Sequence, residues 1–125
     1  MNKINETDEK LLCPIKYTLG IVGGKWKLPI ICILSSGEPY RFNYIKKRLP
    51  EITNMMLTQS LKEMEASGMV GRKQFNEVPP HVEYTLTEKG KSLLKPLESL
   101  AEWGIENMHQ EADNLSLCEN CQAEK

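Results

Sequence analysis

One stretch of the chain carries several side chains suited to contact with another molecule. Residues 53–67 place amide, hydroxyl, thioether and amine groups at helical spacing, in Thr53, Asn54, Met55, Thr58, Gln59 and Lys62. Amides can bridge an adenine edge, hydroxyls reach a base or a phosphate, a thioether packs on a thymine methyl, and an amine meets a phosphate. As a group they favour contact with nucleic-acid bases. For any single member, a solvated position without a partner is the alternative.

Cys13 is the thiol of chemical interest. It precedes Pro14, and proline favours the first position of a helix, so Cys13 is expected at a helix N-terminus. The helix dipole favours a thiolate there, and Lys16 is close in sequence, which makes Cys13 a candidate redox sensor. A partly buried capping residue in a subunit contact is the alternative.

The remaining cysteines and the tryptophans call for plainer interpretations. Cys32 lies inside the apolar run "IICIL" and is predicted to be a core residue. Cys118 and Cys121 form one C-x-x-C, but a structural zinc needs four ligands, so we predict a solvated dithiol and no cofactor. A zinc site completed by His109 and a partner chain is the alternative. Trp26 and Trp103 are predicted to pack at a subunit seam.

Caps and helix breakers predict the elements that position the polar residues. Thr53 caps a helix that runs to about Ser67 and ends at Gly68, with Leu57, Leu61 and Met64 forming an apolar stripe. Before it, Asn43 caps a short helix over residues 44–49 that Pro50 stops. Two helices joined by a tight turn, the second polar on its outer side, are typical of a helix-turn-helix.

Two strands are predicted next, over residues 69–75 and 81–86. The second alternates strictly, and residues 76–80 form a loop with two prolines at its tip, outside the paired ladder. A hairpin directly after a helix-turn-helix is a wing. Its stems carry Arg72, Lys73, Gln74 and His81, which would lie beside the minor groove.

Thr87 caps a final helix from Glu88 onward, which Pro96 should bend. This helix has more apolar surface than a small winged domain can cover, which favours a second copy as its partner. The predicted fold is therefore α+β, mainly α: a winged helix-turn-helix with a two-stranded wing and additional N- and C-terminal dimerisation helices. Residues 13–110 would form this domain, with flexible tails at 1–12 and 111–125.

The charges divide along the chain although the net charge is only -1. Residues 24–75 carry nine Lys or Arg against four acids, whereas residues 76–125 carry four Lys against ten acids. This asymmetry predicts a basic face opposed by an acidic one.

An enzyme is not expected, because two histidines and no Gly-rich phosphate loop offer little to catalyse with. The start "MNKINETDEK" lacks the apolar core of a signal peptide, so we expect a cytoplasmic protein that does not associate with a membrane.

Several blocks resemble the HxlR-type family of winged-helix bacterial transcriptional regulators, which is related to the MarR group. The resemblance covers roughly residues 13–108 and rests on "CPIKYTLGIVGGKWKLPII", "RFNYIKKRLPEIT", "MLTQSLKEMEASGMV", "VPPHVEYTLTEKG" and "LAEWG". It implies a homodimer built from the first and last helices that binds operator DNA as repressor or activator. In some members the cysteine at the position of Cys13 senses electrophiles or oxidants. Two residues depart from the family pattern. His81 follows the proline pair, where the family often has Arg or Lys, and Lys62 stands where the family commonly has Arg.

We therefore expect a homodimeric regulator with the helix at about Thr53 to Ser67 in the major groove and the wing, residues 72–81, near the minor groove. Cations elsewhere would hold the DNA backbone without reading sequence: Lys25, Lys27, Arg41, Lys46 and Lys47. The expected partners are an operator duplex, a second copy, and an oxidant or small-molecule inducer. The alternative is a winged-helix module that docks proteins without binding DNA; it would need an apolar, uncharged outer face on the second helix.

Overall fold

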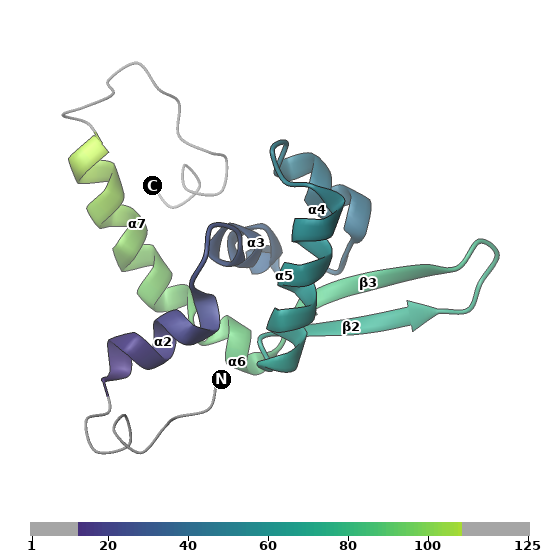
Figure 1. The fold of residues 1–125 in the computed structure, drawn as a ribbon, viewed down its shortest axis with the longest axis horizontal. Coiled ribbons are helices and arrows are strands. Elements are labelled where there is room, and N and C mark those ends of the chain that lie inside the picture. Colours follow the sequence, from purple (N-terminus) through teal and green to yellow (C-terminus); the bar gives the residue numbers. More distant parts are fainter. Residues whose placement is uncertain (1–12, 109–125) are drawn as a thin grey trace.

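The computed structural model describes residues 13–108, and Figure 1 shows their arrangement. In chain order the elements are α2 (Pro14–Val22), α3 (Lys27–Ile33), the 3-10 turn η1 (Leu34–Ser36), β1 (Tyr40–Arg41), α4 (Phe42–Arg48), α5 (Asn54–Ala66), β2 (Val70–Phe75), β3 (His81–Leu86), α6 (Glu88–Lys91) and α7 (Leu94–Met108). The predicted class is confirmed: a mainly helical winged helix-turn-helix. The expected flexible tails, with Cys118 and Cys121, lie outside the described residues.

The core forms where α3, α4 and α5 pack against one another and against the sheet. Its fully buried side chains come from all of these elements: Ile30, Ile31, Leu34, Ile45, Leu57, Leu61, Met64 and Val70. The predicted stripe of α5 is thus confirmed. Burying one such aliphatic side chain stabilises the fold by about 1.5–3 kcal/mol, so this small cluster orients the helices.

The helix-turn-helix consists of α4 and α5. Thr53 caps α5 as predicted, since its hydroxyl oxygen accepts a hydrogen bond from the Met56 backbone N–H at 3.1 Å. Gly68 follows the C-terminal end with φ of 83°, a left-handed conformation that glycine adopts without a Cβ clash. The predicted cap of α4 at Asn43 was wrong: α4 begins at Phe42, with Arg41 at the N-cap position.

A third strand explains this shift. Tyr40 and Arg41 form β1, which pairs antiparallel with β3 through Tyr40 with Tyr84 and Arg41 with Glu83. The sheet order is β1-β3-β2, so the predicted two-stranded sheet gains an edge strand. Because the ladder holds Arg41 extended, the helix starts directly after it.

The wing is the hairpin β2–β3, which projects away from the helices (Figure 1). Its register runs from Val70 opposite Leu86 to Phe75 opposite His81. Residues 76–80 join the strands at the tip, as predicted, and Val78 there is 99% exposed.

The C-terminal segment is broken where the sequence predicted only a bend. α6 ends at Lys91 and α7 starts at Leu94, so two helices replace the single helix expected from Glu88. Proline lacks the N–H that would bond the carbonyl of the residue four before it. Pro96 therefore lies in the first turn of the new helix α7, and the next N–H, that of Leu97, bonds the Leu93 carbonyl at 3.1 Å.

Neither a simple membrane span nor a metal cluster occurs in residues 13–108. No single helix there is long and apolar enough to cross a membrane; only α2 and Lys27–Ser36 taken together meet that test, as a pair bent by 73°. Ile30, Ile31 and Ile33 of the second member are buried in the core. No group of three or more His, Cys, Asp or Glu in this range could hold a metal ion.

Candidate nucleic-acid interface

Helix α5 turns its polar side chains away from the core. Asn54, Met55, Thr58, Gln59 and Lys62 are all exposed, and we call them the outer face of α5. Met55 is 80% exposed, so its thioether is accessible to a partner. Thr53 is exposed as well, but its hydroxyl oxygen is occupied by the cap hydrogen bond. The structure thus brings together the residues that the sequence singled out on this helix.

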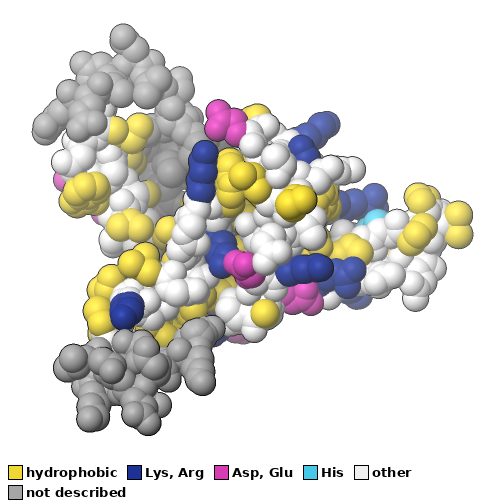
Figure 2. All heavy atoms as spheres, viewed as in Figure 1, with side chains coloured by type: hydrophobic (Ala, Val, Ile, Leu, Met, Phe, Trp, Pro, Cys, Tyr) yellow, Lys and Arg dark blue, Asp and Glu magenta, His cyan; other side chains and the backbone are white. Residues whose placement is uncertain are grey.

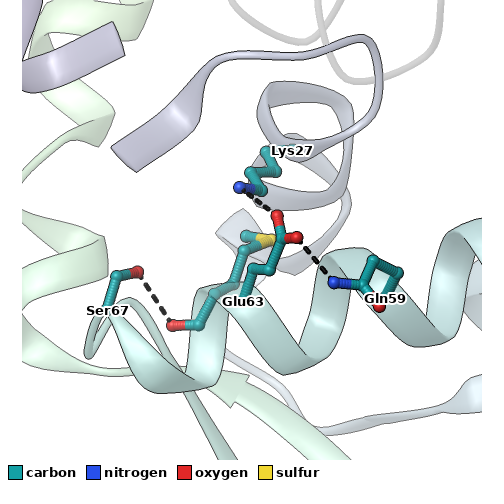
Figure 3. Close-up of polar contacts among 5 residues, drawn as sticks. Lys27, Gln59, Glu63 and Ser67 are labelled. Carbon is teal, nitrogen blue, oxygen red and sulfur yellow. Dashed lines mark hydrogen bonds and ion pairs between the residues drawn. The ribbon is translucent and has the colours of Figure 1, made fainter. Parts of the chain in front are cut away.

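An acidic residue that sequence analysis did not select borders this face. Glu63 accepts a hydrogen bond from Gln59 Nε2 to its Oε2 at 2.7 Å, and its Oε1 lies 2.7 Å from Lys27 Nζ of α3 (Figure 3). The hydrogen bond from Gln59 and the contact with the Lys27 ammonium lower the pKa of Glu63 below its ordinary value. Lys27 is thereby committed to a salt bridge within the protein, whereas the sequence suggested a contact to the DNA backbone. The i,i+4 spacing of Gln59 and Glu63 was a signal that could have identified their pairing.

The wing presents two cations. Arg72 and Lys73 are exposed on β2, and Lys73 Nζ lies 5.0 Å from the centroid of the Phe75 ring. Lys73 also stands opposite Glu83 in the ladder. Both cations could meet phosphates or a narrow groove.

His81 is held inside the wing. Its ring stacks on Phe75 with centroids 4.6 Å apart, and its side chain is only 13% exposed. Nε2 lies 3.1 Å from Glu83 Oε2 and Nδ1 lies 3.7 Å from Glu77 Oε1. These contacts favour a structural role for His81, which would stiffen the hairpin. The phosphate contact predicted from its position is less favoured.

The cations expected to hold the DNA backbone are spread around α5. Lys25, Arg41 and Lys47 are exposed, with Lys25 Nζ 5.0 Å from the Trp26 ring, whereas Lys46 is half-buried on α4. Figure 2 shows Lys and Arg side chains gathered over the helix-turn-helix and the base of the wing.

An aromatic pair that sequence analysis missed joins β1 to helix α4. The rings of Tyr40 and Tyr44 stack at 4.3 Å, and Arg48 Nη1 donates a hydrogen bond to the Tyr44 hydroxyl at 3.0 Å. The i,i+4 spacing of Tyr44 and Arg48 was a usable signal, but the Tyr40 contact depends on where β1 ends.

Cys13 is exposed at the N-cap of α2. Its Sγ accepts a hydrogen bond from the Lys16 backbone N–H at 3.5 Å, as expected for a thiol at a helix N-terminus. Cys32, predicted to be core, is half-buried on α3. Trp26 packs against the core, whereas Trp103 is 66% exposed.

Two helices at the end of the molecule away from the wing carry exposed apolar side chains. On α2 these are Ile15, Tyr17 and Leu19, exposed by 68%, 57% and 58%. On α7, Leu100 and Trp103 are exposed by 57% and 66%, and no residue of that helix is fully buried. Figure 2 shows hydrophobic side chains over this end. Patches of this kind usually mark a contact with another chain.

Comparison with known proteins identifies this arrangement. Residues 21–112 match the family model described as HxlR-like helix-turn-helix. The chain belongs to this family. An uncharacterized HTH-type transcriptional regulator of Methanothermobacter thermautotrophicus is 47% identical over 105 residues, covering 83% of this chain and 79% of that protein. The chain is therefore a member of a family of transcriptional regulators that are not enzymes, as the sequence indicated.

Solved structures of other regulators resemble this HxlR-like chain. The redox regulator HypR in its oxidized form is 42% identical, with a TM-score of 0.70, over 75% of this chain and 96% of that one. The reduced form of the transcriptional regulator YodB from B. subtilis is 32% identical, with a TM-score of 0.67, over 84% of this chain and 99% of that one.

The Glu63 contacts predict a pH effect on stability. Folding lowers the pKa of Glu63, so its contribution is fully present above the ordinary value of 4.5 and is lost as the pH falls through the lowered value. We therefore expect the free energy of unfolding, measured in urea, to decrease less between about pH 7 and about pH 3 in Glu63→Gln than in the wild type. Glu65→Gln on the same helix should keep the loss; equal behaviour of the two variants would contradict the assignment.

Proposed function

We propose that the chain acts in the cytoplasm as a homodimeric, sequence-specific DNA-binding regulator of transcription. The observation that carries this proposal is the outer face of α5: a continuous set of exposed amide, hydroxyl, thioether and amine groups. It lies on the second helix of a helix-turn-helix, the element that enters the major groove in this motif. Asn54, Met55, Thr58, Gln59 and Lys62 would contact base edges and the nearest phosphates, with Thr53 at the helix start.

The flanking elements would hold the duplex. Arg72 and Lys73 would set the wing near the minor groove, and Lys25, Arg41 and Lys46 would contact phosphates. The exposed polar face argues against a module that docks only proteins, because desolvating Asn54, Gln59 and Lys62 against an apolar partner would leave their polar groups unpaired.

The apolar surfaces of α2 and α7 would form the subunit contact. On α7 the exposed Leu100 and Trp103 share one flank of the helix, while Lys95, Glu102 and Glu106 share the adjacent flank at helical spacing. A second copy related by a two-fold axis presents the same apolar surface, so one contact would cover the patches of both subunits. Pairing would also present two copies of α5 to successive turns of one duplex.

Binding to DNA should depend steeply on salt. If about six phosphates are neutralised per dimer, affinity for a selected duplex should fall by ~10³ between about 50 and about 200 mM salt. Fluorescence anisotropy with the full chain measures this. Lys62→Ala should reduce the slope of log affinity against log salt concentration by about one for each phosphate that is no longer neutralised. Lys95→Ala, the same charge change on α7, should leave this slope unchanged. A nearly salt-independent curve for the wild type would count against DNA as the partner.

The subunit contact can be tested on α7. Trp103→Glu places a charge in the proposed apolar seam, which should convert the dimer to a monomer in sedimentation equilibrium. Glu102→Gln, one residue away and about 100° around the helix axis, should remain dimeric. A wild-type chain that sediments as a monomer would overturn the homodimer.

We further propose that Cys13 makes DNA binding sensitive to oxidants. The thiol is exposed beside the apolar surface of α2, and the similar proteins HypR and YodB support a redox response. Oxidation there would alter the packing of α2 against its partner and so the spacing of the two recognition helices.

Diamide should therefore change the affinity of the wild-type chain for DNA by about ten-fold, and reductant should reverse the change. Cys13→Ser should abolish the response, while the double variant C118S/C121S should keep it. A response that persists in Cys13→Ser would assign the sensing thiol elsewhere.

A further inference from the structure

Glu63 is chemically out of place on a DNA-reading helix. A carboxylate beside the outer face of α5 would repel phosphates and has no general use in the major groove except with cytosine. Yet its two oxygens have separate partners, Lys27 Nζ on one and Gln59 Nε2 on the other, each at 2.7 Å (Figure 3). Lys27 neutralises the charge, so the carboxylate can lie here without opposing DNA.

Lys27 also fixes where the carboxylate lies. Its side chain is 14% exposed on α3, against 47% for Glu63, so the ammonium belongs to the packed interface between α3 and α5. α3 is held in turn by Ile30 and Ile31, both fully buried. The acceptor that meets Gln59 is therefore attached to the core through a second helix.

An ionised carboxylate accepts hydrogen bonds and cannot donate them. This determines which way round the Gln59 amide lies: Nε2 must face Glu63, and Oε1 must face away from it. The amide keeps one further N–H after this bond. Gln59 thus offers a base one acceptor in a fixed orientation and at most one donor.

We propose that Glu63 is a positioning residue that gives Gln59 its base preference. The inference rests on the DNA-binding function proposed above. With Oε1 held as the acceptor, Gln59 suits a base with an amino group in the major groove. Adenine is the best match, because N6 donates to Oε1 and N7 accepts the remaining N–H; cytosine offers only its N4 amino group. In the same pose guanine O6 and thymine O4 would meet Oε1 lone pair to lone pair, so these bases could accept only the remaining N–H.

The two partners of Glu63 then have separable effects. Removing the carboxylate frees the Gln59 amide to turn over and donate to guanine or thymine, so discrimination at one base position is lost. Removing the Lys27 ammonium leaves an unneutralised carboxylate near the duplex, so affinity should fall for every sequence. A merely structural role for Glu63 would weaken all sequences alike.

The experiment starts with selection by the full-length wild-type chain from duplexes with a randomised core of ~20 base pairs, which spans two half-sites. Dissociation constants are then measured on duplexes with each of the four bases at every selected position. The position read by Gln59 is the one whose preference disappears in Gln59→Ala. We expect the wild type to favour adenine there over guanine or thymine by about ten-fold.

Glu63→Gln should reduce that preference to about three-fold or less, since a glutamine at position 63 can donate as well as accept. Glu63→Ala should do the same, and the double variant Q59A/E63Q should match Gln59→Ala. Glu65→Gln is the matched control and should keep the wild-type preference. Thermal unfolding verifies that each variant is folded.

Full adenine preference in both Glu63→Gln and Glu63→Ala would overturn this inference and leave the DNA-binding function intact. A preference for guanine or thymine at the Gln59 position of the wild type would also overturn it. A wild-type chain that selects no sequence from the library would instead overturn the proposed function, and this inference with it.

Discussion

The fold depends on the attachment of α5 by one side only. Leu57, Leu61 and Met64 are exposed by at most 2%, and together they bind the helix to α3, α4 and the sheet. The three side chains recur at i, i+4 and i+7, which confines the buried contact to a narrow stripe. Because the stripe is sufficient to hold the helix, the opposite side is free to carry polar groups that serve a partner. The caps at Thr53 and Gly68 define the length of helix that can enter a groove.

Other contacts hold α5 and its neighbouring elements in place. β1 ties the start of α4 to the central strand β3, so the first helix of the motif cannot rotate independently of the wing. The salt bridge from Lys27 to Glu63 adds a polar link between α3 and α5 at the edge of the apolar contact. In the wing, the stack of His81 on Phe75 covers one face of an otherwise thin hairpin. A surface that must match DNA loses less conformational entropy on binding when it is already ordered.

Local signals predicted the parts of this structure that local chemistry decides. The cap at Thr53, the glycine after α5, its apolar stripe and its outer face could all be read from residues within one or two turns of each other. β1 could not, because a strand of two residues has no periodicity and forms only when β3 pairs with it. Lys27 is far away in sequence from Glu63 and reaches it only through the packing of α3 on α5. The contacts of His81 could not be predicted either, because cross-strand pairing, which its neighbours in sequence do not reveal, places it opposite Phe75 and beside Glu77 and Glu83.

The apolar surface of α2 and α7 places a constraint on any account of the molecule. An exposed indole and four other large apolar side chains lie on α2 and α7 and face away from the core, while α5 and the wing lie at the other end. Contact of this apolar surface with water is unfavourable, which favours a partner that covers it. In the proposed dimer a second copy would cover this surface at the end away from α5 and the wing. If two such helices bind one duplex, the distance between the subunits becomes part of the binding energy, and a change at Cys13, at the start of α2, would alter that distance under this proposal.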